Sequence, residues 1–236
     1  MAGDRRNFLG RLAAGAAAAA GVVGLEPHRL DAETTIRPVS DKWDMSWAGR
    51  INGKFRAVFD SPKIEEGGEL WRAATWRTQI IDVYGVKDAD VNPVLVIRHG
   101  GIPLVMNDAF WARHKIGKKR KIKDPVTGKT ADTNPIGDFK DRKDIPAWMT
   151  EASIARFTER GGVVLGCNFA FGMMVQLEMD ADKEHAADKE HAKEHAKEAR
   201  ERALTYLLPG VILQPSGFFA LLEAQRAGCQ LFTAGG

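Results

Sequence analysis

Short runs of β-branched and aromatic residues alternate along most of this chain with longer amphipathic stretches. The runs have the length and composition of strands and lie at 55–60, 94–97, 163–165, 211–213 and 230–233. The stretches between them have the spacing of helices and lie at 69–84, 102–116, 151–160, from 168 onward, and at 218–227. Strands separated by helices pair in parallel through right-handed crossovers. We therefore expect one α/β domain, a three-layer α/β/α sandwich around a mainly parallel five-stranded sheet.

The first 25 residues have the pattern of an export signal. Arg5 and Arg6 are adjacent, and an uncharged stretch rich in alanine and glycine follows at 12–25. A basic start, a short apolar segment and small residues are typical of a secretory signal, and the arginine pair resembles the twin-arginine type. The stretch is shorter than the roughly 20 residues that span a bilayer. We expect export to the periplasm and no stable membrane insertion afterwards; an ordinary alanine-rich helix is the alternative.

The charge balance excludes several classes of function. The chain has 34 basic and 31 acidic side chains, a net charge of +3, and 44% hydrophobic residues. This composition supports one folded core and gives no electrostatic reason to expect nucleic-acid binding. The two cysteines, Cys167 and Cys229, are too few for a disulfide-stapled small fold or a four-cysteine zinc site.

The remaining organisation has three parts. Residues 26–54 are expected to form an N-terminal arm with an exposed Trp43 and Trp47, before a single domain at 55–236. An insert at 117–149 contains three prolines and a basic cluster, a pattern typical of a functional loop or of a solvated turn. A second insert, at 180–202, repeats Lys-Glu-His-Ala and predicts a solvent-facing extension of the helix that begins at 168.

Two side chains that can carry chemistry follow predicted strands. Ligands of parallel α/β sheets bind at the carboxyl ends of the strands. Cys167 precedes a helix, whose partly positive N-terminus favours the thiolate, and His99 precedes two glycines that leave room for a ligand. The alternatives stay open: Cys167 as a small buried hydrophobe, and His99 as a core or loop histidine.

No disulfide, cofactor or metal site is expected. Cys229 precedes the last strand, so it lies at the opposite edge of the sheet from Cys167, about 16 Å away. A disulfide tolerates only about 7 Å between Cα atoms. His191 and His195 lie one helical turn apart without an evident third ligand, and the sequence contains no glycine-rich phosphate loop or serine nucleophile elbow.

Several strings resemble exported members of the DsrE/DsrF-like sulfur-relay family. They are Trp-Asp-Met-Ser-Trp at 43–47, Val-Leu-Val-Ile-Arg-His-Gly-Gly at 94–101, Leu-Val-Met-Asn-Asp-Ala-Phe-Trp at 104–111, and the segments 162–168 and 209–228. The resemblance implies an α/β/α sandwich, assembly into trimers or hexamers, and a cysteine after a central strand that carries sulfur as a persulfide. Cys167 occupies the position of that cysteine.

These observations lead to one functional hypothesis, one main alternative, and a third interpretation in which the histidine array that includes His191 and His195 buffers metal ions in the periplasm. In the hypothesis, the protein is a periplasmic homo-oligomer in which Cys167, as an accessible thiolate, accepts sulfane sulfur or passes it to a thiol or sulfur-carrier partner. His99 would relay a proton or orient the incoming group. In the alternative, the chain is a non-catalytic binding or assembly module, with Cys167 buried and unreactive.

Overall fold

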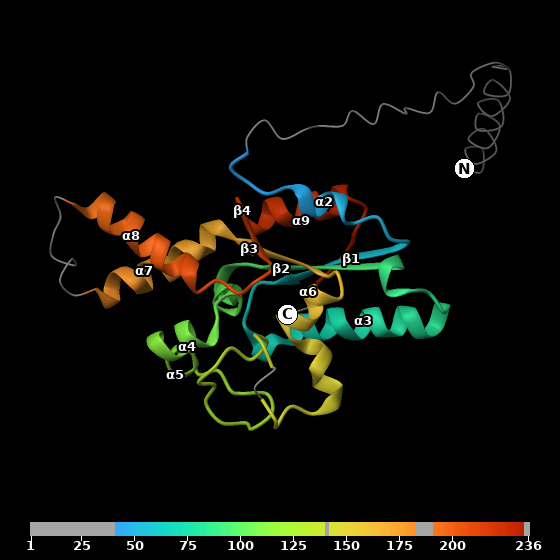
Figure 1. Ribbon diagram of the computed structural model, residues 1–236, viewed down its shortest axis with the longest axis horizontal. Coiled ribbons are helices and arrows are strands. Elements are labelled where there is room, and N and C mark those ends of the chain that lie inside the picture. Colours follow the sequence, from blue (N-terminus) through green and yellow to red (C-terminus); the bar gives the residue numbers. More distant parts are fainter. Residues whose placement is uncertain (1–40, 140–141, 183–190, 234–236) are drawn as a thin grey trace, which may run out of the picture. The chain divides into compact units, whose positions relative to one another are not determined.

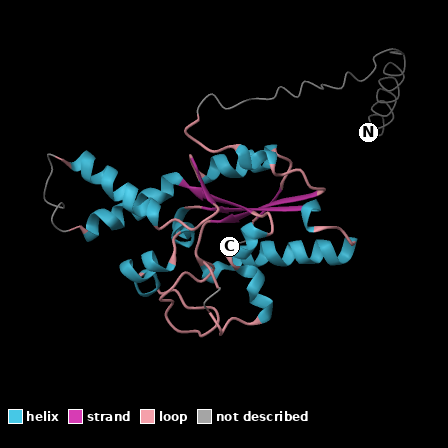
Figure 2. Cartoon of the chain, viewed as in Figure 1, coloured by secondary structure: helices cyan, strands magenta, loops and turns pink. Residues whose placement is uncertain are grey.

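A computed structural model describes residues 41–139, 142–182 and 191–233, and its centre is one parallel sheet (Figures 1 and 2). The strands are β1 (Phe55–Ser61), β2 (Val91–Ile97), β3 (Val163–Cys167), β4 (Val211–Gln214) and β5 (Gln230–Phe232). They lie in the order β4-β3-β2-β1-β5, and every neighbouring pair is parallel. The predicted three-layer sandwich with a five-stranded parallel sheet is confirmed. The export signal predicted at 1–25, and residues 26–40 of the arm, lie outside the described residues.

Helices cover both faces of the sheet. The α-helices are α2 (Ser46–Gly49), α3 (Gly68–Tyr84), α4 (Asp108–His114), α5 (Ile116–Arg120), α6 (Ile154–Glu159), α7 (Asn168–Ala181), α8 (Ala192–Thr205) and α9 (Gly217–Arg226). The 3₁₀ turns are η1 (Glu65–Gly67), η2 (Asp88–Asp90), η3 (His99–Val105) and η4 (Ala147–Ala152). Side chains of α3, α4, α6 and α7 form one core with one face, whereas those of α2 and α9 form a second core with the other.

The handedness of the crossovers explains this division. The connections from β1 to β2, β2 to β3 and β3 to β4 all step in the same direction across the sheet. Right-handed crossovers in one direction place their helices on one face. The last connection runs back across the sheet from β4 to β5, so α9 lies on the other face. The chain therefore leaves β3 and β4 toward opposite faces.

The segment predicted as one helix at 102–116 is divided into η3, α4 and α5. Pro103 lies within η3, and a proline has no amide N–H to donate to a continuing α-helix. Asn107 starts a new helix, because its side-chain oxygen accepts a hydrogen bond of 3.1 Å from the amide of Phe110. Lys115, with a φ of 51°, ends α4 in the left-handed conformation.

Trp47, predicted to be exposed, is fully buried. It lies in α2 and belongs to the core between the sheet and α9, with Val58 and Leu221 among its members. The prediction was wrong because the partner of Trp47 lies at the other end of the sequence. The part of the arm that the structure describes is therefore integrated into the domain.

The insert at 180–202 is not a simple extension of α7. Helix α8 is separate and packs against α7, with small buried side chains at Ala199 and Ala203. Arg202 forms ion pairs with Glu178 (3.7 Å) and Asp182 (3.3 Å) of the preceding segment. The alanine stripe allows close approach, and the arginine fixes α8 to the domain.

The insert at 117–149 contributes to the core rather than forming only a solvated turn. Ile136, Ala131 and Met149 are buried in it. The side-chain amide of Asn134 donates hydrogen bonds to the carbonyls of Leu104 (2.8 Å) and Met106 (2.7 Å). These bonds hold the insert against η3 on one side of the sheet.

Candidate functional site

Cys167 and Gln214 end the neighbouring strands β3 and β4 and are paired in register. After them the chain turns to opposite faces, into α7 and α9. Such a reversal is a topological switch point, where open α/β sheets bind their ligands at the carboxyl ends of the strands. The sequence places Cys167 at this edge, and the structure places the same residue at the switch point itself.

Cys167 caps helix α7. Its Sγ accepts a hydrogen bond of 3.4 Å from the amide of Ala170, in the first turn of the helix. The thiol is free, and the residue is only 6% exposed. Cys167 therefore lies at a helix N-terminus, as predicted, but it is buried among the core side chains of this face, which the alternative interpretation expected, rather than accessible.

Arg98 is the charged residue beside Cys167. It follows Ile97, which is paired with Gly166 of β3, so the register brings Arg98 next to Cys167. Its guanidinium donates two hydrogen bonds of 2.7 Å to the carboxylate of Asp60 on β1. These bonds raise the pKa of Arg98; burial opposes them, and the negative charges of Asp60 and of ionised Cys167 add to the increase.

The side chain of Arg98 is held in place by α9. A Cβ atom at Gly217 would lie 2.6 Å from the Cβ and Cδ of Arg98, so this position requires glycine. The ring of Phe218 covers the guanidinium at 5.3 Å. Arg98 is not among the site residues predicted from the sequence. An arginine directly after a fully apolar strand, together with Asp60 near the end of another strand, nevertheless indicates an ion pair at this edge of the sheet.

His99 differs from this arrangement. It is exposed, and its φ of 52° lies in the left-handed region. Within the described part of the chain, no hydrogen bond or ion pair joins its ring to Cys167. The structure therefore brings Arg98, rather than His99, into electrostatic contact with the thiol, and it leaves His99 on the same loop.

Glu69 extends the polar groups along this edge to α3. It is buried at the start of the helix, where its carboxylate accepts a hydrogen bond of 2.7 Å from Arg72. Burial raises the pKa of Glu69; Arg72 opposes the increase, and the nearby charges of Glu65 and Asp60 add to it. Its second oxygen, Oε2, has no hydrogen-bond partner among the described residues. Arg98, Asp60 and Glu69 thus form a row of ionisable side chains that ends beside the thiol of Cys167.

Two phenylalanines project beside the switch point. Phe169 is the second residue of α7 and is 85% exposed, and Phe218 is the second residue of α9 and is also largely exposed. Asn168 is held by a hydrogen bond of 2.6 Å from Arg200 of α8. The starts of both helices therefore present apolar surface next to the covered thiol.

Cys229 lies at the opposite edge of the sheet, directly before β5, as its spacing predicts. It is free and buried. Burial raises the pKa of its thiol to about 11, and Arg56 opposes the increase. Cys229 is therefore protonated at neutral pH and serves as an internal reference for the reactivity of Cys167.

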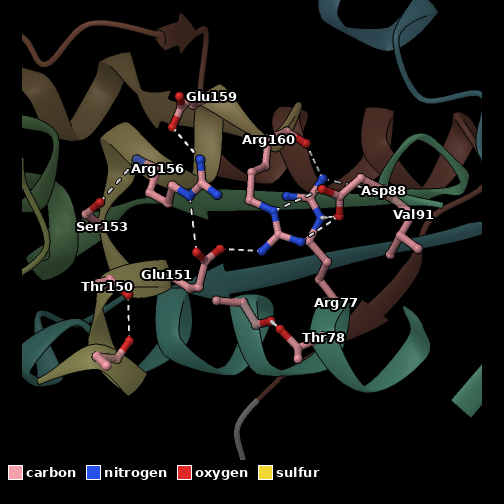
Figure 3. Close-up of polar contacts among 12 residues, drawn as sticks. Arg77, Thr78, Asp88, Val91, Thr150, Glu151, Ser153, Arg156, Glu159 and Arg160 are labelled. Atoms are coloured by element: carbon pink, nitrogen blue, oxygen red, sulfur yellow. Dashed lines mark hydrogen bonds and ion pairs between the residues drawn. The ribbon is translucent and has the colours of Figure 1, made fainter. Parts of the chain in front are cut away.

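A larger charged cluster lies at the amino ends of the strands (Figure 3). The buried guanidinium of Arg77, on α3, donates to the carbonyl of Val91 at the start of β2 and to that of Arg160 at the end of α6, shortly before β3. Arg160 in turn pairs with Asp88 and Glu151. The cluster ties α3 to two strands at the edge away from the switch point, which is a structural role.

Among the described residues, no group of three or more His, Cys, Asp or Glu side chains is arranged to hold a metal ion. His191 and His195 lie with ring centroids 6.3 Å apart. No family model matches the chain, and neither a curated protein nor a solved structure matches it. The resemblance to the DsrE/DsrF-like family stays a prediction from the sequence.

Proposed function

We propose that this protein is an exported, periplasmic sulfur-handling protein in which Cys167 accepts sulfane sulfur. The observation that carries the proposal is the position of its Sγ at the switch point, hydrogen-bonded to the amide of Ala170. The resemblance to the sulfur-relay family selects the same residue. The arginine pair at Arg5 and Arg6 supports export, and none of the described helices is long and apolar enough to cross a bilayer.

Three groups favour a negative charge on the sulfur. A hydrogen bond from an amide is stronger to a thiolate than to a thiol, and Ala170 supplies one. The N-terminus of α7 adds the partial positive charge of its aligned peptide groups. Arg98 adds a full positive charge whose position is fixed by Asp60. A thiolate is the form of cysteine that attacks sulfur.

The proposed step transfers one sulfur atom without a net oxidant. The thiolate of Cys167 attacks the outer sulfur of a persulfide R–S–SH, and a new S–S bond forms at Cys167. The S–S bond of the donor breaks, its electron pair leaves with R–S⁻, and Cys167 becomes a persulfide. His99, exposed on the adjoining loop, is the group that we assign to protonate the leaving thiolate.

The covered position of Cys167 restricts the donor. Because Cys167 is only 6% exposed, the proposal requires a donor small enough to enter a covered site, rather than the active-site loop of a folded protein. The proposed donors are therefore low-molecular-weight persulfides and polysulfides. Delivery onward to a thiol or sulfur-carrier protein would require the surface around Phe169 and Phe218 to open.

Treatment with a polysulfide tests this proposal. After reaction with sodium tetrasulfide, peptide mass spectrometry should find a persulfide, an increase of about 32 Da, on Cys167. Cys229→Ser should keep the modification, and Cys167→Ser should lose it. An unmodified Cys167 under conditions that modify free glutathione, or a modification confined to Cys229, would contradict the proposal.

The exposed apolar side chains favour a second proposal, which is assembly with another copy of this chain. Phe169 and Met173 form one pair at a four-residue step on α7, and Phe218 and Leu222 form another on α9. Strand β4 is an edge strand whose first three residues are only half buried. Large apolar side chains that gather on the surface of a soluble protein mark interaction surfaces. We therefore assign these two pairs to the contact between copies.

Light scattering tests the assembly. The molar mass of the full chain in solution should exceed the 25.9 kDa of one subunit. The double variant Phe169→Ser/Leu222→Ser should shift this mass toward that of the monomer. Exposed Val83→Ser, on α3, is the matched control and should leave the mass unchanged. A monomeric wild-type protein would exclude this proposal and leave the chemistry of Cys167 unaffected.

A further inference from the structure

A separate cavity lies where the loop after β1 meets the insert at 117–149. Its volume is about 250 Å³. Its apolar walls come from Trp71 of α3, from Pro125, Pro135 and Ile136 of the insert, and from Met149. None of the residues around Cys167 lines it, so the cavity is distinct from the candidate sulfur site.

The walls are held in place by close packing and hydrogen bonds. A Cβ atom at Gly67 would lie 1.8 Å from the Cγ2 of Ile136, so the side chain of Ile136 packs directly on the backbone of the loop. The amide of Ile136 donates to the side chain of Asn134 (3.0 Å), and its carbonyl accepts from the amide of Ile154 (2.7 Å). The cavity is therefore preformed, as small-molecule sites usually are.

Two acidic residues and one aromatic residue contribute to the rim of this mainly apolar cavity. Glu65 and Glu66 contribute to its lining, and both are exposed to solvent. Lys63 lies 3.6 Å from Glu65, whereas no lysine or arginine of the described segments forms an ion pair with Glu66. The indole of Trp71, 45% exposed, lines the same space. Carboxylates attract organic cations, and the face of an indole binds them by a cation–π interaction.

We propose that this cavity binds a primary ammonium ion that carries a compact apolar group. The apolar group enters between Trp71, Ile136 and Met149, where burial of apolar surface drives binding. The ammonium stays at the mouth beside Glu66. A neutral ligand of the same shape gains only the apolar contacts, and an anion of that shape is repelled by Glu65 and Glu66. The charge of the ligand therefore sets the order of affinities among ligands of one shape.

Three probes of one shape and different charge test the proposal on the full chain: benzylamine, benzyl alcohol and benzoate. Titrations followed by ¹⁵N–¹H NMR should show benzylamine binding roughly threefold or more tightly than benzyl alcohol, with benzoate weakest, which is the scale of one partly exposed ion pair. The preference should shrink as salt is raised from 20 to 300 mM. Shifts should map to residues of the loop, the start of α3 and the insert.

Two variants separate the charge from the apolar contacts. Glu66→Gln should abolish the preference for benzylamine and leave benzyl alcohol binding unchanged. Trp71→Leu, at a half-exposed position, should weaken both probes. The control Glu201→Gln, an exposed carboxylate on α8, should change neither. Equal binding of benzylamine and benzyl alcohol to the wild type, no binding of benzylamine, or a preference that survives in Glu66→Gln would each overturn the proposal.

Discussion

Arg98 and Asp60 join the carboxyl ends of β2 and β1 through two hydrogen bonds of 2.7 Å each. Asp60 is buried, the guanidinium of Arg98 is covered by Phe218, and the aliphatic part of the Arg98 side chain packs against Gly217. When an ion pair is removed from water, each charge loses hydration free energy, and the attraction of its partner compensates for that loss. The pair therefore stabilises the edge of the sheet and also holds a positive charge beside Cys167.

The two roles of this pair can be separated by substitution. Arg98→Gln should lower the free energy of unfolding by about 2 kcal/mol, because it leaves Asp60 buried without its partner. It should also slow persulfide formation at Cys167 roughly threefold to tenfold, because the positive charge is lost. Asp60→Asn should lower stability to a similar extent but keep the reactivity of Cys167, since the guanidinium remains.

Urea unfolding and the rate of persulfide formation are the two measurements. Arg226→Gln, which removes an exposed ion pair with Glu223 on α9, is the matched control and should change neither. If Arg98→Gln reacts like the wild type while losing stability, Arg98 is structural and does not assist the thiolate.

Glu69 predicts a dependence of stability on pH. Because burial raises its pKa, the folded state binds this proton more tightly than the unfolded state does. Its contribution to stability is complete below the ordinary pKa of a glutamate and is lost as the pH rises through the higher folded value. Glu69→Gln removes this loss and keeps an acceptor for Arg72. The variant should gain about 1 kcal/mol over the wild type at pH 7 and no advantage at pH 4.

Urea unfolding at a series of pH values between 4 and 8 measures the difference. Glu201→Gln, at an exposed position, should give a curve parallel to that of the wild type. A constant difference between Glu69→Gln and the wild type across the whole range would show that the buried carboxyl does not titrate differently in the folded state.

The sheet could be predicted from the sequence because its signals are local. The strand run at 94–97 is continuous and apolar, as expected of a strand covered on both faces, and β2 is fully buried. The edge that carries Cys167 follows from the same signals, because a residue after a parallel strand must lie at the carboxyl edge. Parallel pairing follows from the alternation of strands with helices, without knowledge of any tertiary contact.

Other features depend on contacts that spacing does not reveal. The burial of Trp47 depends on α9, and the packing of α8 depends on a buried carboxylate of α7. Pro103 indicates that no single helix runs through this segment, because proline lacks the amide that a helix interior needs. The helical spacing of the apolar residues at 102–116 nevertheless predicts one helix. Predicting that Arg98 lies beside Cys167 requires the register between β2 and β3, which pairs residues far apart in the sequence.

Asp124 organises the insert at 117–149. Burial raises the pKa of its carboxyl, but hydrogen bonds from Arg142 and from the amides of Thr127 and Val126 outweigh burial and lower the pKa to about 2. Its contribution to stability is present above the ordinary pKa of an aspartate and is lost as the pH falls through about 2. Asp124→Asn should cost about 1 to 2 kcal/mol at pH 7, measured by thermal unfolding, and progressively less as the pH falls toward about 2.

The control for this prediction is Asp132→Asn, at an exposed carboxylate of the same insert, which should not alter stability. The cavity described above gives an independent readout, because Pro125 adjoins Asp124. Loss of order in the insert should weaken the binding of benzyl alcohol as well as that of benzylamine. An Asp124→Asn protein as stable as the wild type at pH 7 would show that the insert is held by its apolar contacts alone.

Glu178 anchors α8, and the last prediction concerns this anchor. The carboxylate is 1% exposed; its Oε1 lies 2.5 Å from Nε2 of His114 and 3.4 Å from Nε of Arg113, and its Oε2 lies 3.7 Å from Nε of Arg202. Helix α8 buries mainly small side chains, so its attachment depends more on polar contacts than on apolar area.

Glu178→Gln should lower stability by about 2 kcal/mol and speed amide exchange throughout 192–205, because it leaves the surrounding cations without their counter-charge. Arg202→Gln, which removes only the partner on α8, should cost about 1 kcal/mol and raise exchange in the same segment. Hydrogen exchange followed by mass spectrometry measures both effects, with β2 as the internal reference that should stay protected. If exchange in α8 is unchanged in both variants, the alanine contacts at Ala199 and Ala203 are sufficient to hold the helix in place.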